Sequence, residues 1–329
     1  MHNLPLRLTR QRRSATLRAM LQETYLHTQQ LIAPVFVSEV HTRANAISSM
    51  PGVYQLPLST LTQEIDSLAA LNIPAVILFG LPAQKDAVGS AAVDPNGIIQ
   101  RAIRLIRKHN PDMIIIADVC LCEYTDHGHC GILNQQRIDH AATLSHLAAL
   151  AVSYAEAGAD WVAPSSMTDG MVAGIRQALD ECNYHHVAIL SYAVKYSSSF
   201  YGPFREAALG APQFGDRKTY QMNPCNAQEG VREAELDVAE GADMLMVKPA
   251  MNYLDMILRL KQRFPSVPLC AYQVSGEYAM IKKAAACGLI NEHDAMLETL
   301  TAIKRAGADL IITYFAKDLA KWLLKKIVG

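Results

Sequence analysis

Short apolar segments alternate with helical segments along almost the whole chain, and this alternation constrains the fold more than any other feature. Ala- and Leu-rich segments whose apolar residues recur with helical spacing separate most of the β-branched ones. Continuous apolar strands that alternate with helices predict a parallel sheet buried on both faces. The eight predicted strands lie at residues 31–37, 74–80, 113–119, 160–165, 187–195, 243–249, 267–275 and 309–315.

A tripeptide repeats at three of the junctions between a helix and the next strand. Gly-Ala-Asp occupies residues 158–160, 241–243 and 307–309. A glycine at this point caps a helix in the left-handed conformation, and the tripeptide then turns the chain into the next strand. The repetition indicates one supersecondary unit that is used several times.

The number of strands decides the fold class. Eight strands in a chain of 329 residues match a closed (β/α)8 barrel, the TIM barrel. The alternative is a doubly wound open sheet, but no GxGxxG motif follows an early strand. We therefore predict an α/β protein with a catalytic barrel over residues 29–329 and an extended N-terminal arm over residues 1–28.

The arm is rich in arginine, with Arg7, Arg10, Arg12, Arg13 and Arg18 ahead of the first acidic residue. Such a start is typical of a mitochondrial presequence and equally of a basic arm that contacts an acidic neighbour. The N-terminal segment lacks the apolar stretch and small-residue cleavage site of a secretory signal, so we expect that the protein is not secreted. Its cysteines would then be in a reducing compartment and remain free thiols.

The charge balance argues against two classes of partner. The chain has 30 basic and 31 acidic residues, and no apolar run approaches the ~20 residues that span a bilayer. We expect a soluble protein that acts on small molecules, with neither nucleic acid nor membrane as a partner.

Polar residues end six of the eight predicted strands, and the carboxyl ends of barrel strands are where chemistry gathers. These residues are Asp118, Ser165, Lys195, Lys248, Ser275 and Tyr314.

Lys195 and Lys248 each close an otherwise apolar strand. One interpretation is that each side chain snorkels out of its strand end. Because consecutive strands lie roughly 4.8 Å apart, the two ammonium groups would instead crowd the same barrel mouth. Like charge and burial both lower the pKa of a lysine and give a neutral amine nucleophile near pH 7. Two such amines predict imine formation with two carbonyl substrates.

The connection over residues 196–226 is long and rich in Gly, Pro and Ser. Loops of this length inside a compact domain are usually lids or disordered segments. Arg205 and Arg217 lie in it among aromatic residues. Solvated surface charge is one interpretation, and arginine forks that clamp substrate carboxylates as the lid closes are the other.

Three of the seven cysteines gather in DVCLCEYTDHGHCG (118–131): Cys120, Cys122 and Cys130. A disulfide, chance clustering and a metal site compete as explanations. Residues i and i+2 of an extended segment face the same way, and the loop can return Cys130 as a third thiol, so we favour zinc. Three thiolates predict a site with an open position, unless His127 or His129 completes the shell.

Several motifs together resemble one enzyme family. GADMLMVKPAMNY (241–253) resembles the active-site signature of the porphobilinogen synthases, also called 5-aminolaevulinate dehydratases, and DVCLCEYTDHGHCG resembles their zinc-binding motif. FYGPFRE, FGDRKTYQMNP, AYQVSGEYAMI and IKRAGADLIITYFA resemble other landmarks of the family, and TRQRRSATLRAM resembles its N-terminal arm. The resemblance covers nearly the whole chain.

The resemblance implies a lyase that condenses two 5-aminolaevulinate molecules to porphobilinogen with loss of two waters, early in tetrapyrrole (haem) biosynthesis. It also implies a cytoplasmic homo-octamer in which the arm embraces a neighbouring subunit. The implied roles are Schiff-base formation for Lys248 and Lys195, binding of one substrate carboxylate by Arg205 and Arg217 and of the other by Ser275 and Tyr314, zinc binding by Cys120, Cys122 and Cys130, and a place beside the chemistry for Asp118.

Two further implications concern the edges of the site. Many members of the family bind an allosteric magnesium through a glutamate that corresponds to Glu233, although by itself Glu233 has the pattern of an exposed helical acid. APSSMTDGM (163–171) departs from the APSDMMDGR form common in the family, but Ser165 is retained and is expected to contact substrate. The competing functions are a class I Schiff-base aldolase on the same barrel and a non-enzymatic zinc-binding scaffold.

Overall fold

A closed barrel of parallel strands forms the centre of the chain. The computed structural model describes residues 6–328, so positions 1–5 of the predicted arm and residue 329 lie outside the described part. The eight barrel strands pair in chain order, and β12 pairs with β1 at Leu31–Ile311 to close the ring. They are β1 (Leu31–Ser38), β4 (Ala75–Leu81), β5 (Ile114–Val119), β8 (Trp161–Pro164), β9 (Ala188–Lys195), β10 (Met244–Lys248), β11 (Leu269–Gln273) and β12 (Leu310–Thr313). This arrangement confirms the predicted (β/α)8 fold.

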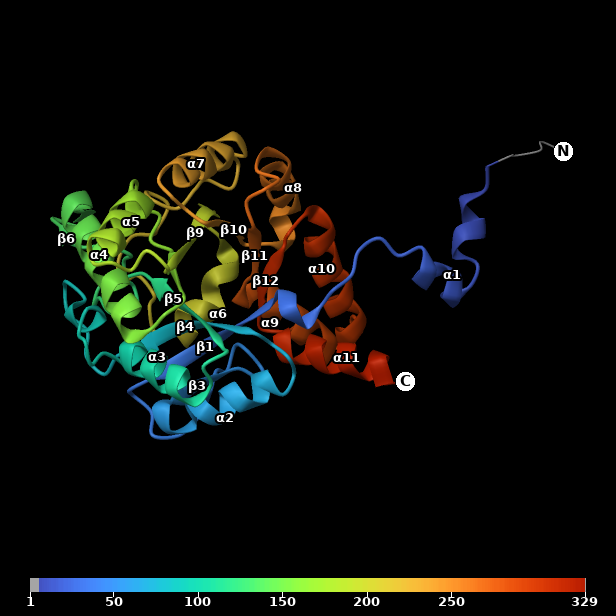
Figure 1. Ribbon diagram of the computed structural model, residues 1–329, viewed down its shortest axis with the longest axis horizontal. Coiled ribbons are helices and arrows are strands. Elements are labelled where there is room, and N and C mark those ends of the chain that lie inside the picture. The colour runs from blue at the N-terminus through green and yellow to red at the C-terminus, as the bar shows by residue number, and fades with distance from the viewer. Residues whose placement is uncertain (1–5, 329) are drawn as a thin grey trace.

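Helices surround the barrel on all sides (Figure 1). None of the described helices is long and apolar enough to cross a membrane. The surrounding helices are α2 (Leu58–Ala69), α3 (Ile98–His109), α4 (His140–Ala157), α5 (Met171–Glu181), α7 (Gln228–Ala239), α8 (Leu254–Arg263), α9 (Ser275–Ala286), α10 (Glu292–Ala306) and α11 (Ala316–Val328), with short turns η3 (Ser90–Ala92) and η5 (Met251–Tyr253).

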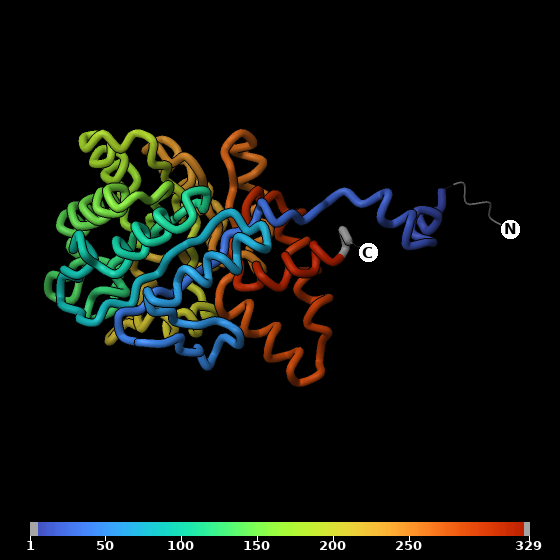
Figure 2. Tube along the Cα trace, turned by 60° about the horizontal axis from the view of Figure 1, so that its bottom comes forward, coloured from blue at the N-terminus to red at the C-terminus, as the bar shows by residue number. Residues whose placement is uncertain are grey.

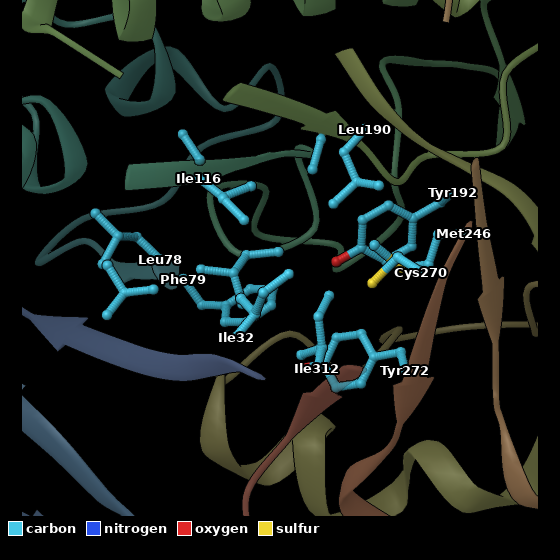
Figure 3. Close-up of a cluster of buried hydrophobic side chains, with 14 of the residues drawn as sticks. Ile32, Leu78, Phe79, Ile116, Leu190, Tyr192, Met246, Cys270, Tyr272 and Ile312 are labelled. Carbon is cyan, nitrogen blue, oxygen red and sulfur yellow. The ribbon is translucent and has the colours of Figure 1, made fainter. Parts of the chain in front are cut away.

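The barrel interior is a packed core whose polarity changes around the ring. Figure 3 shows Ile32, Leu78 and Ile116 together with Phe79 on one side, while Ile312 lies beside Tyr272. On the other side Tyr192, Met246, Cys270 and Tyr272 bring phenol rings and sulfur into the same core. Tyr192 lies on β9 and Tyr272 on β11, the strands that flank β10. Both rings therefore lie next to Lys248, the last residue of β10.

The repeated Gly-Ala-Asp tripeptide staples the amino ends of the strands. Each glycine has a positive φ. Each aspartate accepts a backbone N–H from the first or second residue of the preceding barrel strand. Asp160 accepts from Ile115 at 2.7 Å, Asp243 from Ile189 at 2.7 Å and Asp309 from Leu269 at 2.9 Å. Each aspartate N–H also donates to the carbonyl of that same residue. The motif thus joins neighbouring strands by a side-chain and a backbone bond.

The structure adds elements that the strand pattern did not predict. β2 (Asn45–Ala46) and β3 (Tyr54–Pro57) extend the sheet beyond β1, and β6 (Leu133–Asn134) forms a hairpin with β7 (Arg137–Ile138). The long connection after β9 is partly helical, with η4 (Ser199–Tyr201) and α6 (Gly202–Ala207). We keep the name lid for residues 196–226.

The described part of the arm projects away from the barrel (Figure 1). It contains η1 (Leu8–Arg12), α1 (Ala15–Met20) and η2 (Thr28–Gln30), and neither η1 nor α1 has a buried residue. Figure 2 shows the same separation from a second direction. Leu8, Met20 and Leu21 are exposed apolar side chains on this arm.

We expect loss of an aspartate staple to destabilise the barrel. Asp309→Ala removes a charge-assisted hydrogen bond to the start of β11, together with a partly exposed ion pair with Lys261, and should lower the free energy of unfolding by about 1–3 kcal/mol in urea denaturation. Asp255→Ala is the matched control, because Asp255 on α8 forms an exposed ion pair with Arg259 at 3.8 Å and, within residues 6–328, accepts no hydrogen bond from a barrel strand. Equal unfolding midpoints for the two variants would contradict a stapling role.

Candidate active site

Two lysines lie side by side where β9 and β10 end. Lys195 and Lys248 are the last residues of these strands, and their Cα atoms are partners in the strand pairing. Both side chains are buried, at 5% and 6% exposure, so neither one snorkels into solvent. The structure therefore brings the two amines to one mouth of the barrel.

The amine of Lys248 sits among aromatic rings. Its Nζ lies 4.4 Å from the ring centre of Tyr272, 4.9 Å from that of Tyr192 and 5.1 Å from that of Phe204. Burial lowers the pKa of Lys248 to about 7 and the positive charge of Lys195 adds to this effect, whereas Asp118 opposes it. Imine formation requires a neutral amine, and a pKa near 7 leaves a substantial fraction of Lys248 neutral at physiological pH.

Asp118 and Ser165 form the floor beneath the two amines. Ser165 donates a hydrogen bond of 2.8 Å to Asp118, and the Nζ of Lys195 donates to the Ser165 carbonyl. Burial raises the pKa of Asp118, while the charges of Lys248 and Lys195 oppose that rise. The other carboxylate oxygen of Asp118 is buried and makes no well-aligned hydrogen bond with the described residues, although the Tyr192 hydroxyl lies close enough to lower the pKa of Asp118. Asp118 can therefore accept a further proton or hydrogen bond inside the site.

Three cysteine thiols converge beside this floor. Cys120 and Cys122 have their sulfurs 3.4 Å apart, and the sulfurs of Cys120, Cys122 and Cys130 all lie within 4.8 Å of one another. Hydrogen bonds from Cys120 and Cys122 lower the pKa of Cys130, and Arg217 and Lys195 lower it further against the effect of burial. A buried thiolate with two thiols directed at it is a donor set able to hold a metal ion, and soft thiolates suit zinc.

The two neighbouring histidines are committed to other contacts. His129 has Tyr220 OH 3.1 Å from one ring nitrogen and the Phe214 carbonyl 3.1 Å from the other. His127 contacts the Ala87 carbonyl through Nε2 and accepts the His129 N–H through Nδ1. In this arrangement neither histidine joins the thiol cluster.

The lid brings both predicted arginines to the site. Arg205 lies on α6, where burial and the charge of Arg217 lower its pKa. Arg217 is 6% exposed and donates to the carbonyls of Gly128 and Gly210 at 2.8 and 2.6 Å. Burial lowers the pKa of Arg217, but the charge of Cys130 and Cys122 outweighs this and raises it. Arg217 is a buried and Arg205 a half-buried positive group, which together suit an anionic ligand.

Ser275 and Tyr314 lie just beyond the strands on which they were predicted. Ser275 is the first residue of α9, because β11 ends at Gln273, and Tyr314 follows the last residue of β12. Ser275 Oγ accepts the Phe204 N–H of the lid at 2.9 Å, and Tyr314 OH lies 3.1 Å from Tyr272 OH. The strand prediction was wrong at these ends because a buried apolar run does not reveal where pairing stops.

One small cavity joins several of these groups, but neither Ser275 nor Tyr314 lines it. Its volume is about 20 Å³, and it is bounded by the two lysines, the two arginines, the floor residues and one cysteine. Its lining comprises Phe79, Asp118, Cys122, Glu123, Ser165, Lys195, Tyr201, Phe204, Arg205, Arg217, Gln221 and Lys248. Residues from five barrel strands or their loops, and from the lid, therefore meet at one point.

Comparisons with known proteins agree with this geometry. The family model described as delta-aminolevulinic acid dehydratase matches residues 6–322. The chain belongs to this family. It is 55% identical to the delta-aminolevulinic acid dehydratase of Halalkalibacterium halodurans, over 95% of each chain, and 53% identical to that of Bacillus subtilis, over 95% of this chain and 97% of the relative.

A solved structure of the same family superposes on nearly all of the chain. It is the dehydratase (porphobilinogen synthase) of Toxoplasma gondii ME49 in complex with the reaction product porphobilinogen. The TM-score is 0.97 at 40% identity, and the match covers 100% of this chain and 94% of the other. The family membership makes the chain a dehydratase and favours neither the aldolase nor the scaffold alternative.

Glu233 stands apart from the other predicted residues. It lies on α7 and lines a separate outer cavity of about 1060 Å³, which Cys130 and Gln221 also border. It is half-buried and not an exposed acid as its pattern indicated. Burial raises the pKa of Glu233, and the negative charges of Asp169, Glu229 and Glu240 add to the rise.

Three residues of the dehydratase site were not singled out from the sequence. Glu123 is 3% exposed between two of the cysteines, and burial raises its pKa to about 7. Gln221 is 3% exposed in the lid, and neither of its amide atoms has a hydrogen-bond partner in the described chain. Tyr192 lies in the middle of β9 with its ring beneath both amines. The position of Glu123 inside the cysteine motif was a signal, whereas nothing local distinguishes Tyr192 from a core residue.

We expect the charge of Lys195 to help keep Lys248 neutral. Lys195→Met removes the like charge, so the pKa of Lys248 should rise and its neutral fraction at pH 7 should fall. The pH midpoint for cyanoborohydride trapping of 4-oxopentanoate on Lys248 should then move to higher pH, as read by peptide mass spectrometry. Lys195→Arg keeps the charge and should leave the midpoint near that of the parent; the same midpoint in Lys195→Met would refute the coupling.

Proposed function

We propose that this cavity condenses two molecules of 5-aminolaevulinate to porphobilinogen with release of two waters, through Schiff bases on Lys248 and Lys195. The observation that carries the proposal is the pair of buried amines at adjacent strand ends, enclosed with two arginines and a three-thiol cluster. A class I aldolase needs one such lysine and no thiol cluster, so it leaves half of this arrangement without a role.

Each amine can activate one keto group. The neutral amine of Lys248 adds to the ketone of one substrate, and loss of the carbonyl oxygen as water leaves an imine that withdraws electrons from the neighbouring carbon. The amine of Lys195 adds to the ketone of the second substrate and forms an imine with loss of water in the same way. A carbon–carbon bond between the two substrates followed by elimination releases one lysine, and the amine of one substrate displaces the other lysine from its carbon, so neither release consumes water. Two ketone oxygens departing as water account for the two waters in the overall balance.

The carboxylate of each substrate has its own polar contacts in this proposal. Arg205 and Arg217 would bind one carboxylate beneath the lid, where their charges already face the cavity. Ser275 and Tyr314 would bind the other, since both hydroxyls lie on the β11 and β12 side of Lys248. Ser165 would contribute through its hydrogen bond to Asp118.

The thiol cluster fits zinc in its donor set and its burial. Cys120, Cys122 and Cys130 would hold the ion, which when bound supplies a weakly acidic cation that orients a substrate amine. Arg217 and Lys195 lie near enough to affect the pKa of Cys130, and they would balance the negative charge of three thiolates.

Proton transfer within the cavity would use Asp118. It touches Ser165, its charge acts on both lysines, and one of its oxygens makes no well-aligned hydrogen bond in the described chain. A carboxylate whose pKa is raised by burial is better matched to accept and return protons near neutral pH than an exposed one.

Substrates can enter only if the lid moves, because a cavity of about 20 Å³ has room for roughly one water. The closed lid is held by hydrogen bonds to β3 and to loops of the barrel. Gln55 donates to the Ala207 carbonyl at 2.7 Å and Lys85 to the Leu209 carbonyl at 2.6 Å. Opening would also break the lid's hydrogen bonds with Gly128, His129 and Ser275, so the closed lid is held at several points.

Three further features of the family are proposed for this chain. Glu233, with Asp169, Glu229 and Glu240 near it, would bind an allosteric magnesium through a carboxylate and waters. The projecting arm, with its unburied apolar side chains, would embrace a neighbouring subunit in a homo-octamer. We also propose a cytoplasmic location, in keeping with the reduced thiols.

The Schiff-base mechanism is tested by trapping. With 5-aminolaevulinate and cyanoborohydride, peptide mass spectrometry should find substrate mass on Lys248 and Lys195, and porphobilinogen should accumulate when the reductant is omitted. Lys248→Met should lower kcat by several orders of magnitude, because removal of a covalent nucleophile eliminates its reaction path. Lys261→Met is the control, since Lys261 forms an ion pair with Asp309 at the opposite end of the barrel. Absence of any adduct in the parent enzyme would refute the proposal.

Metal removal tests the role of the thiol cluster. We expect about one zinc per chain by elemental analysis and its loss with a chelator or in Cys130→Ser. If the ion mainly orients substrate, metal-free enzyme should bind one of its two substrates more weakly, and added zinc should restore activity. Metal-free enzyme with unchanged substrate affinity and no chemistry would contradict this role.

A further inference from the structure

A buried carboxylate links the two strand ends that carry Lys248 and Ser275. Glu277 is the third residue of α9 and is only 1% exposed. Among the described residues, no lysine, arginine or histidine forms an ion pair with it within 4.0 Å. A buried carboxylate without a cation is costly unless hydrogen bonds compensate it.

The compensation comes from backbone N–H groups of two different loops. Glu277 Oε1 accepts from Met251 at 2.7 Å, and Oε2 accepts from Val274 at 2.8 Å and more weakly from Ala250 at 3.5 Å. Burial raises the pKa of Glu277 to about 7, and these backbone bonds oppose the rise. The bond to Val274 is the usual return contact of a glutamate at the third position of a helix. The bonds to Ala250 and Met251 reach the loop after β10, where the short helix η5 begins at Met251, so Glu277 also satisfies N–H groups at the start of a second helix.

The bonded amides lie next to residues of the site. Ala250 and Met251 follow Lys248 after a single proline, and Val274 directly precedes Ser275. One side chain therefore clamps the loop after β10 to the loop after β11. The clamp fixes the distance between the amine that forms an imine and the hydroxyl proposed to hold the carboxylate of that same substrate.

The lid rests on the same clamp. Ser275 Oγ accepts the Phe204 N–H and donates to the Phe200 carbonyl at 3.4 Å. The backbone of Phe200 comes so close to Gly276 that a Cβ there would lie 2.5 Å from the Phe200 oxygen. Glu277 therefore positions the start of α9, which the first residues of the lid contact when the lid is closed.

We propose that Glu277 is a positioning residue that sets the spacing between the Lys248 imine and the Ser275 carboxylate contact, and so selects keto acids by the length of chain between ketone and carboxylate. This inference rests on the proposed function, because it takes Lys248 and Ser275 to hold the same substrate. Glu277 itself does not line the active-site cavity and touches no reacting atom.

The test compares two keto acids that differ by one methylene between ketone and carboxylate. 4-Oxopentanoate keeps the substrate spacing and 5-oxohexanoate exceeds it. Each is trapped on Lys248 with cyanoborohydride, and the ratio of trapping efficiencies is read by mass spectrometry. The parent should prefer the shorter acid by on the order of tenfold or more, as is usual for one methylene in a fitted site. Glu277→Gln, which loses one acceptor and the charge, should reduce this preference at least several-fold.

Two variants separate positioning from general stability. Glu277→Asp keeps the charge but draws the carboxylate back by one methylene, so it should lie between the parent and Glu277→Gln, and it carries the test if the glutamine variant does not fold. Asp243→Asn weakens a similar bond, in which the Asp243 carboxylate accepts the backbone N–H of Ile189. Asp243 directly precedes β10, at the opposite end of this strand from Lys248. Asp243→Asn should lower the unfolding temperature without changing the trapping ratio.

The outcomes distinguish the inference from the function beneath it. If the parent shows no adduct with 5-aminolaevulinate on Lys248, the Schiff-base function fails. If the parent traps that substrate but does not discriminate between the two keto acids, or if both Glu277 variants keep the parent ratio, the positioning role is overturned. An equal loss of discrimination in Asp243→Asn would also overturn it, because the effect would then reflect stability alone.

Discussion

The crowding of two buried lysine amines is the constraint on which the rest of the site depends. Each ammonium ion would be stabilised in water, and burial beside a like charge removes that advantage. The aromatic rings around Lys248 and the carboxylate of Asp118 return part of it. The balance holds the pKa of Lys248 near 7, where the amine is both available as a nucleophile and able to be protonated again.

The same crowding explains why the surroundings carry so many compensating charges. Cys130, Asp118 and Glu123 add negative charge on one side, while Arg205 and Arg217 add positive charge from the lid. Positive and negative groups thus lie next to one another around the cavity, where they can contact both the carboxylate and the amine of a substrate.

Much of this was predictable from the sequence, for identifiable physical reasons. A lysine at the end of an apolar strand and three cysteines within a short loop are local anomalies, so Lys195, Lys248 and the thiol cluster stand out without a structure. Strand order then predicts that they meet. Residues that act through distant contacts leave no such signal: Glu277 has the sequence pattern of an ordinary helix-capping glutamate, and only the folded chain shows that it holds the loop after β10. The ends of β11 and β12 were also missed, because apolar character continues beyond the last paired residue.

The aspartate staples have a consequence for how the two ends of the barrel can vary. Asp160, Asp243 and Asp309 secure the strands from their amino ends, through bonds that involve no residue of the active-site cavity. The opposite rim is therefore free to carry a lid as long as residues 196–226, and to lengthen or exchange its loops, without loosening strand register. The amino ends of the strands thus maintain the scaffold, while the loops at the carboxyl ends can change and give rise to new chemistry.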